Sequence, residues 1–391
     1  MTTEPRASER AAGDPSARRL RDRLRASGAL AIVLVVSGVG ACRQTVLLDA
    51  TERGSDASVS GSDGGAGDGL ARSDGPRFER PPGFCMGGQI VPLLVTMRVP
   101  DLVFAVDHSA AMQSPFGGTT GMTGMTTARI QAVQQAVKAL IGKYQRVVHF
   151  GYEEFPSSSG TCGSSGCCAG DVVPPAPNTA QAIDHVMRRC DGNLPGCAQS
   201  QRPLANALDK CGGTFSSFPN DSGARYVIAL VGGDPTCQGP DPGSAPCADA
   251  IGAVTRLSRA SVRSTLFGVG AETAGSDCLD QIALQSGLEV AATSPYYHLA
   301  RSPSELTAEL EPLMRTIAEE SCHIDILTPP ADPDKVSVLF DGAPVNIDAV
   351  NGWTFNQDST VGLTLHGAAC DTLVAQSPRV EVITGCSSPR H

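Results

Sequence analysis

The stretch Val99-Pro100-Asp101-Leu102-Val103-Phe104-Ala105-Val106-Asp107-His108-Ser109-Ala110-Ala111-Met112 decides the fold. Its continuous apolar run is typical of a strand that is buried on both faces of a parallel sheet. The run ends on an acid that is followed by small residues. In doubly wound sheets, ligands bind just beyond the carboxyl ends of the strands. The stretch therefore predicts a buried strand that brings Asp107 and Ser109 to a candidate binding site.

Apolar strand patterns alternate with amphipathic helix patterns through the middle of the chain. The last helix begins with a capping box made by Ser302 and Glu305. Such alternation predicts an α/β fold over residues 84–321, with a doubly wound, mostly parallel sheet. Further strands are expected at 147–152, 226–231, 264–270 and 296–299, and helices at 130–141, 180–189, 202–208, 247–259, 278–287 and 302–317.

Residues 322–391 carry shorter alternating patterns that predict a small C-terminal β module. Strands are expected at 336–340, 345–347, 361–365 and 380–383. Trp353 is expected in the core of this module rather than at a ligand. So few residues rarely form a stable core alone, so we expect the module to be stabilised by a disulfide or by packing on the α/β domain.

The N-terminal segment has the pattern of an export signal. A basic stretch at 18–25 precedes an apolar stretch at 28–41, which is too short to span a membrane. The small residues before Cys42 resemble a bacterial lipobox, in which Cys42 would carry lipid as the last residue of the 1–42 signal. An ordinary signal peptide with a chance cysteine is the alternative. Residues 43–83 are rich in Gly, Ser and Asp and predict a disordered tether.

The composition agrees with export. The chain of 391 residues contains 14 Cys, and disulfides persist outside the cytoplasm. A net charge of −10 argues against a nucleic-acid partner. We expect the cysteines to form disulfides, with Cys237 and Cys247 pairing because they flank one loop. Without Cys42 the number of cysteines is odd, so one thiol is left free or pairs between chains.

Several motifs together resemble a von Willebrand factor A domain, over about residues 97–320. They are Asp107-x-Ser109-x-Ala111-Met112, Arg202-Pro203-Leu204, Leu230-Val231-Gly232-Gly233-Asp234 and Phe267-Gly268-Val269-Gly270. The whole chain looks like the cysteine-rich, lipid-anchored A-domain proteins of myxobacterial type. The resemblance implies a Rossmann-like fold whose ends lie close together. It thereby implies a Cys85–Cys322 bridge, which would leave Cys370 to pair with Cys386.

The family often binds Mg²⁺ through an Asp-x-Ser-x-Ser strand end, a distant Thr and a distant Asp, and a carboxylate of the partner completes the coordination. This chain keeps Asp107 and Ser109 but has Ala111, Arg202 and Gly232 at the other positions. A degenerate site without metal is therefore expected. Arg202 would either pair with Asp107, receive a carboxylate from a partner, or be an unconstrained surface residue. Magnesium binding would require Asp234 to replace the missing aspartate.

The sequence does not predict an enzyme, because it has no metalloprotease, nucleophile-elbow or P-loop motif. The leading hypothesis is a protein that is lipid-anchored to the bacterial outer membrane, on its periplasmic or its outer face. It would bind a protein partner or mediate adhesion, without a cofactor. One alternative is a structural envelope scaffold with no ligand at the strand ends, and another is a metal-dependent adhesin that uses Asp234.

Overall fold

The computed structural model describes residues 90–116, 127–157, 167–190, 199–216, 223–239, 243–288, 293–356 and 361–385. The predicted signal peptide with Cys42 and the tether 43–83 lie outside these residues, as do Cys85 and Cys386. Of the helices that the structure describes, none combines the length and the apolar composition that a membrane span needs.

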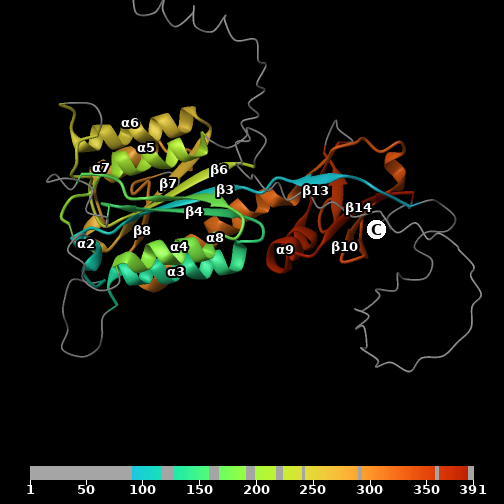
Figure 1. Ribbon diagram of the computed structural model, residues 1–391, viewed down its shortest axis with the longest axis horizontal. Coiled ribbons are helices and arrows are strands. Elements are labelled where there is room, and N and C mark those ends of the chain that lie inside the picture. Colours follow the sequence, from blue (N-terminus) through green and yellow to red (C-terminus); the bar gives the residue numbers. More distant parts are fainter. Residues whose placement is uncertain are drawn as a thin grey trace, which may run out of the picture. The chain divides into compact units, whose positions relative to one another are not determined.

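A six-stranded sheet forms the centre of the α/β domain. Its strands are β3 (Asp101–Asp107), β4 (His149–Phe155), β5 (Val172–Ala176), β6 (Arg225–Val231), β7 (Val262–Val269) and β8 (His298–Ala300). They lie in the order β5-β4-β3-β6-β7-β8, and all neighbours are parallel except β5 and β4 (Figure 1). Every residue of β3 is buried. The predicted α/β fold with a mostly parallel sheet is confirmed, but the antiparallel edge strand β5 was not predicted.

Helices cover both faces of this sheet (Figure 1). One face carries α3 (Arg129–Tyr144), α4 (Ala180–Met187) and α8 (Pro303–Glu319); the other carries α5 (Leu204–Phe215), α6 (Pro246–Arg259) and α7 (Asp277–Leu284). Alternate residues of β3 enter the two apolar cores, since successive strand side chains point to opposite faces. At the start of α8, Oγ of Ser302 accepts the N–H of Glu305 at 3.1 Å, as the capping pattern predicted.

In its described residues, the β module contains two four-stranded sheets and the α-helix α9 (Gly367–Gln376). Two of its strands come from residues 91–97, before the α/β domain, and pair with strands that follow that domain. The expected division assigned residues 91–97 to the α/β domain, whose first strand in fact begins at Asp101. The sheets are β1 (Val91–Pro92), β14 (Val380–Thr384), β10 (Val336–Phe340) and β11 (Ala343–Val345), and β12 (Trp353–Phe355), β13 (Gly362–Leu365), β9 (His323–Ile326) and β2 (Val95–Met97).

Trp353 lies in the core of the β module, as predicted. Its side chain is buried, packs edge-on against Phe355, and donates from Nε1 to the carbonyl oxygen of Val345 at 3.1 Å. The hydrogen bond satisfies the only polar atom of the buried indole. Helix α9 was not predicted.

Disulfides form in this chain, but the predicted pairings were wrong. The described bridges are Cys167–Cys237, Cys247–Cys278 and Cys322–Cys370. Cys237 and Cys247 therefore each bind a different partner, and the Cys322–Cys370 bridge excludes both Cys85–Cys322 and Cys370–Cys386. The fold, rather than the spacing along the chain, decides which sulfur atoms meet.

One free thiol is present among the described residues, Cys211, which is buried in α5. Because other cysteines lie outside the described residues, the expectation that one thiol of the whole chain is left over stays a prediction.

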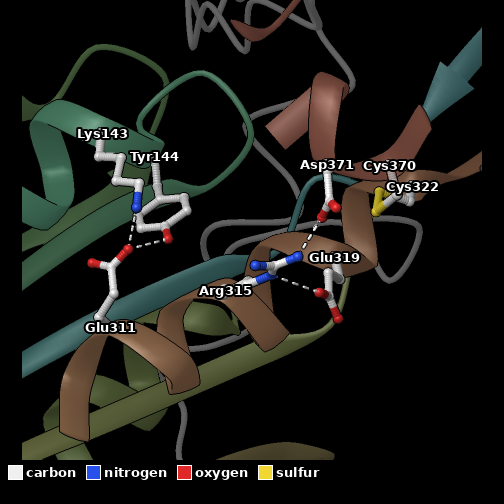
Figure 2. Close-up of polar contacts among 8 residues, drawn as sticks. All are labelled: Lys143, Tyr144, Glu311, Arg315, Glu319, Cys322, Cys370 and Asp371. Atoms are coloured by element: carbon white, nitrogen blue, oxygen red, sulfur yellow. Dashed lines mark hydrogen bonds and ion pairs between the residues drawn. A yellow bond between two sulfur atoms is a disulfide. The ribbon is translucent and has the colours of Figure 1, made fainter. Parts of the chain in front are cut away.

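Helix α8 contacts both α3 and α9 through polar side chains (Figure 2). Glu311 pairs with Lys143 and accepts the hydroxyl of Tyr144 at 2.7 Å. One turn further along α8, Arg315 forms ion pairs with Glu319 and with Asp371 of α9. The Cys322–Cys370 bridge lies just beyond this end of α8. Helix α9 is thus joined to α8 by the ion pair of Asp371 with Arg315, and to the turn that follows α8 by the disulfide.

Candidate functional site

Asp107 ends β3 at the carboxyl edge of the sheet and is fully buried. Its Oδ1 atom accepts the N–H of Ser109 at 2.7 Å, and its Oδ2 atom accepts the N–H of Gly232 at 2.8 Å. Burial raises the pKa of the Asp107 carboxyl, and these hydrogen bonds oppose that rise. The carboxylate therefore joins the turn after β3 to the end of β6.

Ser109 is the N-cap residue of the short helix α2 (Ala110–Gln113) and is buried beside Asp107. Its hydroxyl lowers the pKa of Asp107, yet among the described residues it has no partner with hydrogen-bond geometry. Ser109 thus places a buried hydroxyl beside the Asp107 carboxylate that, within the described part of the chain, has no partner in good hydrogen-bond geometry.

Ala111 and Gly232 lie in contact across the site. A Cβ atom on Gly232 would come within 3.2 Å of Cβ of Ala111 and 3.0 Å of Sδ of Met112. A side chain at Gly232, where the resemblance expects an aspartate, would therefore require Ala111 or Met112 of α2 to shift. Apolar atoms of Ala111 and Met112 therefore lie beside Gly232, where the resemblance expects a carboxylate.

Arg202 lies just before α5 and is tied to the turn after β6. Its backbone N–H donates to Oγ1 of Thr236 at 2.8 Å, and its Nε donates to the carbonyl oxygen of Asp234 at 2.6 Å. The guanidinium packs over Gly233. Arg202 forms no ion pair with Asp107 in the described part of the chain, although its charge lowers the pKa of that carboxyl. We call the cluster of Asp107, Ser109, Ala111, Arg202 and Gly232 the mouth.

Asp234 lies away from the centre of the mouth. Its carboxylate accepts the hydroxyl of Ser276, the N-cap residue of α7, which in turn accepts the N–H of Leu279 at 3.0 Å. Asp234 is therefore engaged by Ser276 in this structure, and its replacement of the missing aspartate stays a prediction. Asp234 is instead placed where a helix N-terminus favours a negative charge.

The donor set at the mouth does not fit Mg²⁺. Both oxygen atoms of Asp107 already accept backbone N–H groups, Ala111 offers only a methyl group, and Arg202 brings a positive charge. Magnesium requires several oxygen ligands in near-octahedral geometry. Within the described ranges, no group of three or more His, Cys, Asp or Glu is placed to hold a metal ion.

Arg129 is the first residue of α3 and contacts α2 next to the mouth. The sequence analysis did not identify it. Its side chain is 4% exposed, and its Nη1 and Nη2 atoms donate to the carbonyl oxygens of Ala111 at 3.1 Å and Pro115 at 3.2 Å. It also forms an ion pair with Glu272. An arginine at the first position of a helix is unfavourable with respect to the helix dipole, and this signal could have identified it.

Titratable groups are also buried on β4, next to β3. Nε2 of His108 lies 3.0 Å from the hydroxyl of Tyr152, and burial lowers the pKa of His108 to about 4. Sγ of Cys211 donates to Glu153 at 2.8 Å, and burial raises the pKa of this carboxyl well above its ordinary value. Glu153 and Glu154 of β4 are both buried.

No protein-family model and no curated protein matches this chain. Similar solved structures include the VWA domain of SpRpn10, at 13% identity and a TM-score of 0.36, covering 55% of this chain and 95% of that one. BatB from Bacteroides thetaiotaomicron has 12% identity and a TM-score of 0.35, covering 56% and 98%. The pilus adhesin SpaC from Lactobacillus rhamnosus GG has 15% identity and a TM-score of 0.42, covering 73% of this chain but only 38% of the adhesin.

The arrangement of strands and helices defines the architecture of the α/β domain. A parallel sheet with β3 at its centre carries one antiparallel edge strand, helices on both faces, and a mouth at the carboxyl ends of β3 and β6. The α/β domain is therefore doubly wound around a mostly parallel sheet, which is the architecture that the resemblance to a von Willebrand factor A domain predicts.

Proposed function

We propose that this protein is lipid-anchored through Cys42 in the bacterial cell envelope and binds a partner protein through the mouth of its A-like domain. The contact is made by a carboxylate of the partner with Arg202, without a metal ion. Binding rather than catalysis is the activity of the site, because none of the mouth residues is arranged as a nucleophile with its base.

The guanidinium of Arg202 is the observation that carries this proposal. Among the described hydrogen bonds, its side chain uses only Nε, which donates to the carbonyl oxygen of Asp234. The backbone contact with Thr236 and the packing over Gly233 fix the base of the side chain. The Nη1 and Nη2 atoms are thus available to a partner, and a guanidinium matches a carboxylate with two parallel hydrogen bonds.

The disulfides support a place outside the cytoplasm. Cys167–Cys237 joins the segment after β4 to the turn after β6, which also contains Asp234. This bridge would hold the turn that carries the acceptor of Arg202. The predicted lipid at Cys42 and the tether 43–83 would then present the mouth at a distance from the outer membrane.

The experiment measures binding of fluorescent peptides rich in Asp and Glu to the oxidised protein, in EDTA and in Mg²⁺. We expect saturable binding that is equal in both buffers and is weakened about tenfold or more by Arg202→Ala, because a charge-assisted bidentate contact is lost. Arg202→Lys should recover only part of the affinity, since lysine cannot form the bidentate contact.

Arg259→Ala is the matched control, because it removes the same charge from an exposed position at the end of α6. Equal losses in Arg202→Ala and Arg259→Ala would indicate nonspecific attraction between charges. The absence of peptide binding would favour the alternative of a structural scaffold, and binding only in Mg²⁺ would favour a metal-dependent adhesin.

A further inference from the structure

Arg129 is buried at a position where the fold does not favour a positive charge. It is the first residue of α3, where the helix dipole is positive, and its side chain is 4% exposed. Burial lowers the pKa of this guanidinium below its ordinary value. Among the described residues its Nε atom has no hydrogen-bond partner. These unfavourable terms must be offset by the contacts that the other two nitrogen atoms make.

Those contacts join the start of α3 to two other segments of the chain. Nη1 donates to the carbonyl oxygen of Ala111 in α2, and Nη2 donates to that of Pro115, two residues after α2. The ion pair with Glu272 reaches the segment after β7. Ala111 also lies close to Gly232, just after β6, where an added Cβ atom would come within 3.2 Å of its methyl group. Helix α2 is thus placed between the guanidinium and the segment that follows β6.

Gly270 provides the space that the guanidinium occupies. Its φ of +112° lies in the region that favours glycine, and a Cβ atom there would come within 2.7 Å of Cζ of Arg129. Its N–H donates to the carbonyl oxygen of Ala300 at 2.8 Å, which ties this segment to the end of β8. The backbone around Arg129 is therefore shaped for a planar cation.

We propose that Arg129 is the positioning residue of the mouth: it acts as a built-in cation that holds α2 and the Asp107–Ser109 turn in one conformation without a bound metal. The inference rests on the proposed function for what the mouth does with that conformation. A partner's carboxylate would meet an Arg202 whose surroundings are already ordered, so that less conformational entropy is lost on binding.

The test is amide hydrogen exchange of the oxidised protein without any ligand. Peptides covering 107–116 report on the mouth, and peptides covering 226–231 report on the centre of the sheet. We expect Arg129→Met to increase exchange in 107–116 by about tenfold and to leave 226–231 unchanged, because only local opening becomes easier. EDTA should leave exchange of the unmodified protein unchanged.

Arg256→Met is the matched control. It removes the same kind of side chain from the ion pair with Asp209 between α5 and α6, which is partly exposed, and should not alter the mouth. If Arg129→Met does not fold, Arg129→Lys decides, because lysine keeps the charge but cannot direct fixed donors at both carbonyl oxygens. It should give a smaller increase confined to 107–116.

Unchanged exchange of 107–116 in the folded variant would overturn the proposal, as would an equal increase at 226–231 or an increase caused by EDTA alone. Failure of the proposed function is distinguishable from these outcomes. If Arg129→Met increases exchange in 107–116 but the unmodified protein binds no acidic peptide, the proposed carboxylate partner is wrong. The role of Arg129 in positioning the mouth is then still supported.

Discussion

The Oδ2 atom of Asp107 accepts the backbone N–H of Gly232 at 2.8 Å, so that one carboxylate connects the ends of β3 and β6. Its Oδ1 atom accepts the backbone N–H of Ser109 at 2.7 Å. We expect Asp107→Ala to lower the free energy of unfolding by about 2–4 kcal/mol, since two buried N–H groups lose their acceptor. Urea unfolding measures the change, and Asp107→Asn should lose less because one acceptor oxygen remains. A stability equal to that of the unmodified protein would show that the carboxylate does not hold the two strands.

Gly232 and Met112 should be energetically coupled. Gly232→Ala places a Cβ atom 3.0 Å from Cγ and Sδ of Met112, and we expect the resulting overpacking to destabilise the protein by about 1–3 kcal/mol. Met112→Ala opens a cavity and destabilises the protein by itself. In the double variant the new methyl group partly fills that cavity, so the combined loss should be smaller than the sum. Strictly additive losses in urea unfolding would contradict the contact.

We expect His108 to lower the free energy of unfolding as the pH falls from 7 to 4. Its pKa falls from 6.5 to about 4 in the folded protein because burial disfavours the charged ring. The neutral form is favoured by folding, so this contribution is complete above pH 6.5 and is lost as the pH falls toward 4. The shift corresponds to about 3 kcal/mol. His108→Gln should flatten the fall in unfolding free energy between pH 7 and pH 4 by roughly that amount. Parallel pH profiles for the two proteins would exclude His108 as the cause.

Divalent cations should not stabilise the protein. A ligand that binds only the folded state raises its stability, so a working metal site would shift thermal unfolding in a saturable way. We expect equal unfolding temperatures in EDTA, Mg²⁺, Ca²⁺ and Mn²⁺. A shift that saturates and disappears in Asp107→Ala would instead restore the metal-dependent reading, and the Ala111, Arg202 and Gly232 positions would then need a different explanation.

The strand pattern was predictable because buried parallel strands have a clear composition. The apolar run at Asp101–Asp107 is completely buried in the structure. The position of the mouth was predictable in part, because the carboxyl ends of parallel strands meet at one edge of the sheet. This holds for any residues that stand at those ends. Its position at the start of a helix could have drawn attention to Arg129, but its contacts with Ala111, Pro115 and Glu272 depend on the tertiary fold and could not be predicted.

Strand and disulfide pairings between residues far apart in the chain could not be predicted from the sequence. Strands β1 and β2 pair with β14 and β9, on the other side of the whole α/β domain. Short strands of two and three residues carry too little alternation to indicate a sheet. The disulfides failed for a related reason, because loop neighbours such as Cys237 and Cys247 lie close in sequence while their sulfur atoms bind Cys167 and Cys278.

The contribution of the Cys322–Cys370 bridge to the stability of the β module can be measured directly. It closes a separation of 48 residues that includes Trp353, the single Trp of the chain, so Trp fluorescence reports on the module. We expect the double variant Cys322→Ser, Cys370→Ser to lower the stability of this transition by about 2–4 kcal/mol, since the unfolded chain gains entropy. The pair Cys247→Ser, Cys278→Ser, which removes the α6–α7 bridge, is the control and should affect the Trp transition less. Mapping of the native protein without reduction should recover Cys322 joined to Cys370. A peptide that joins Cys322 to Cys85 would contradict both the bridge and this explanation of the stability of the module.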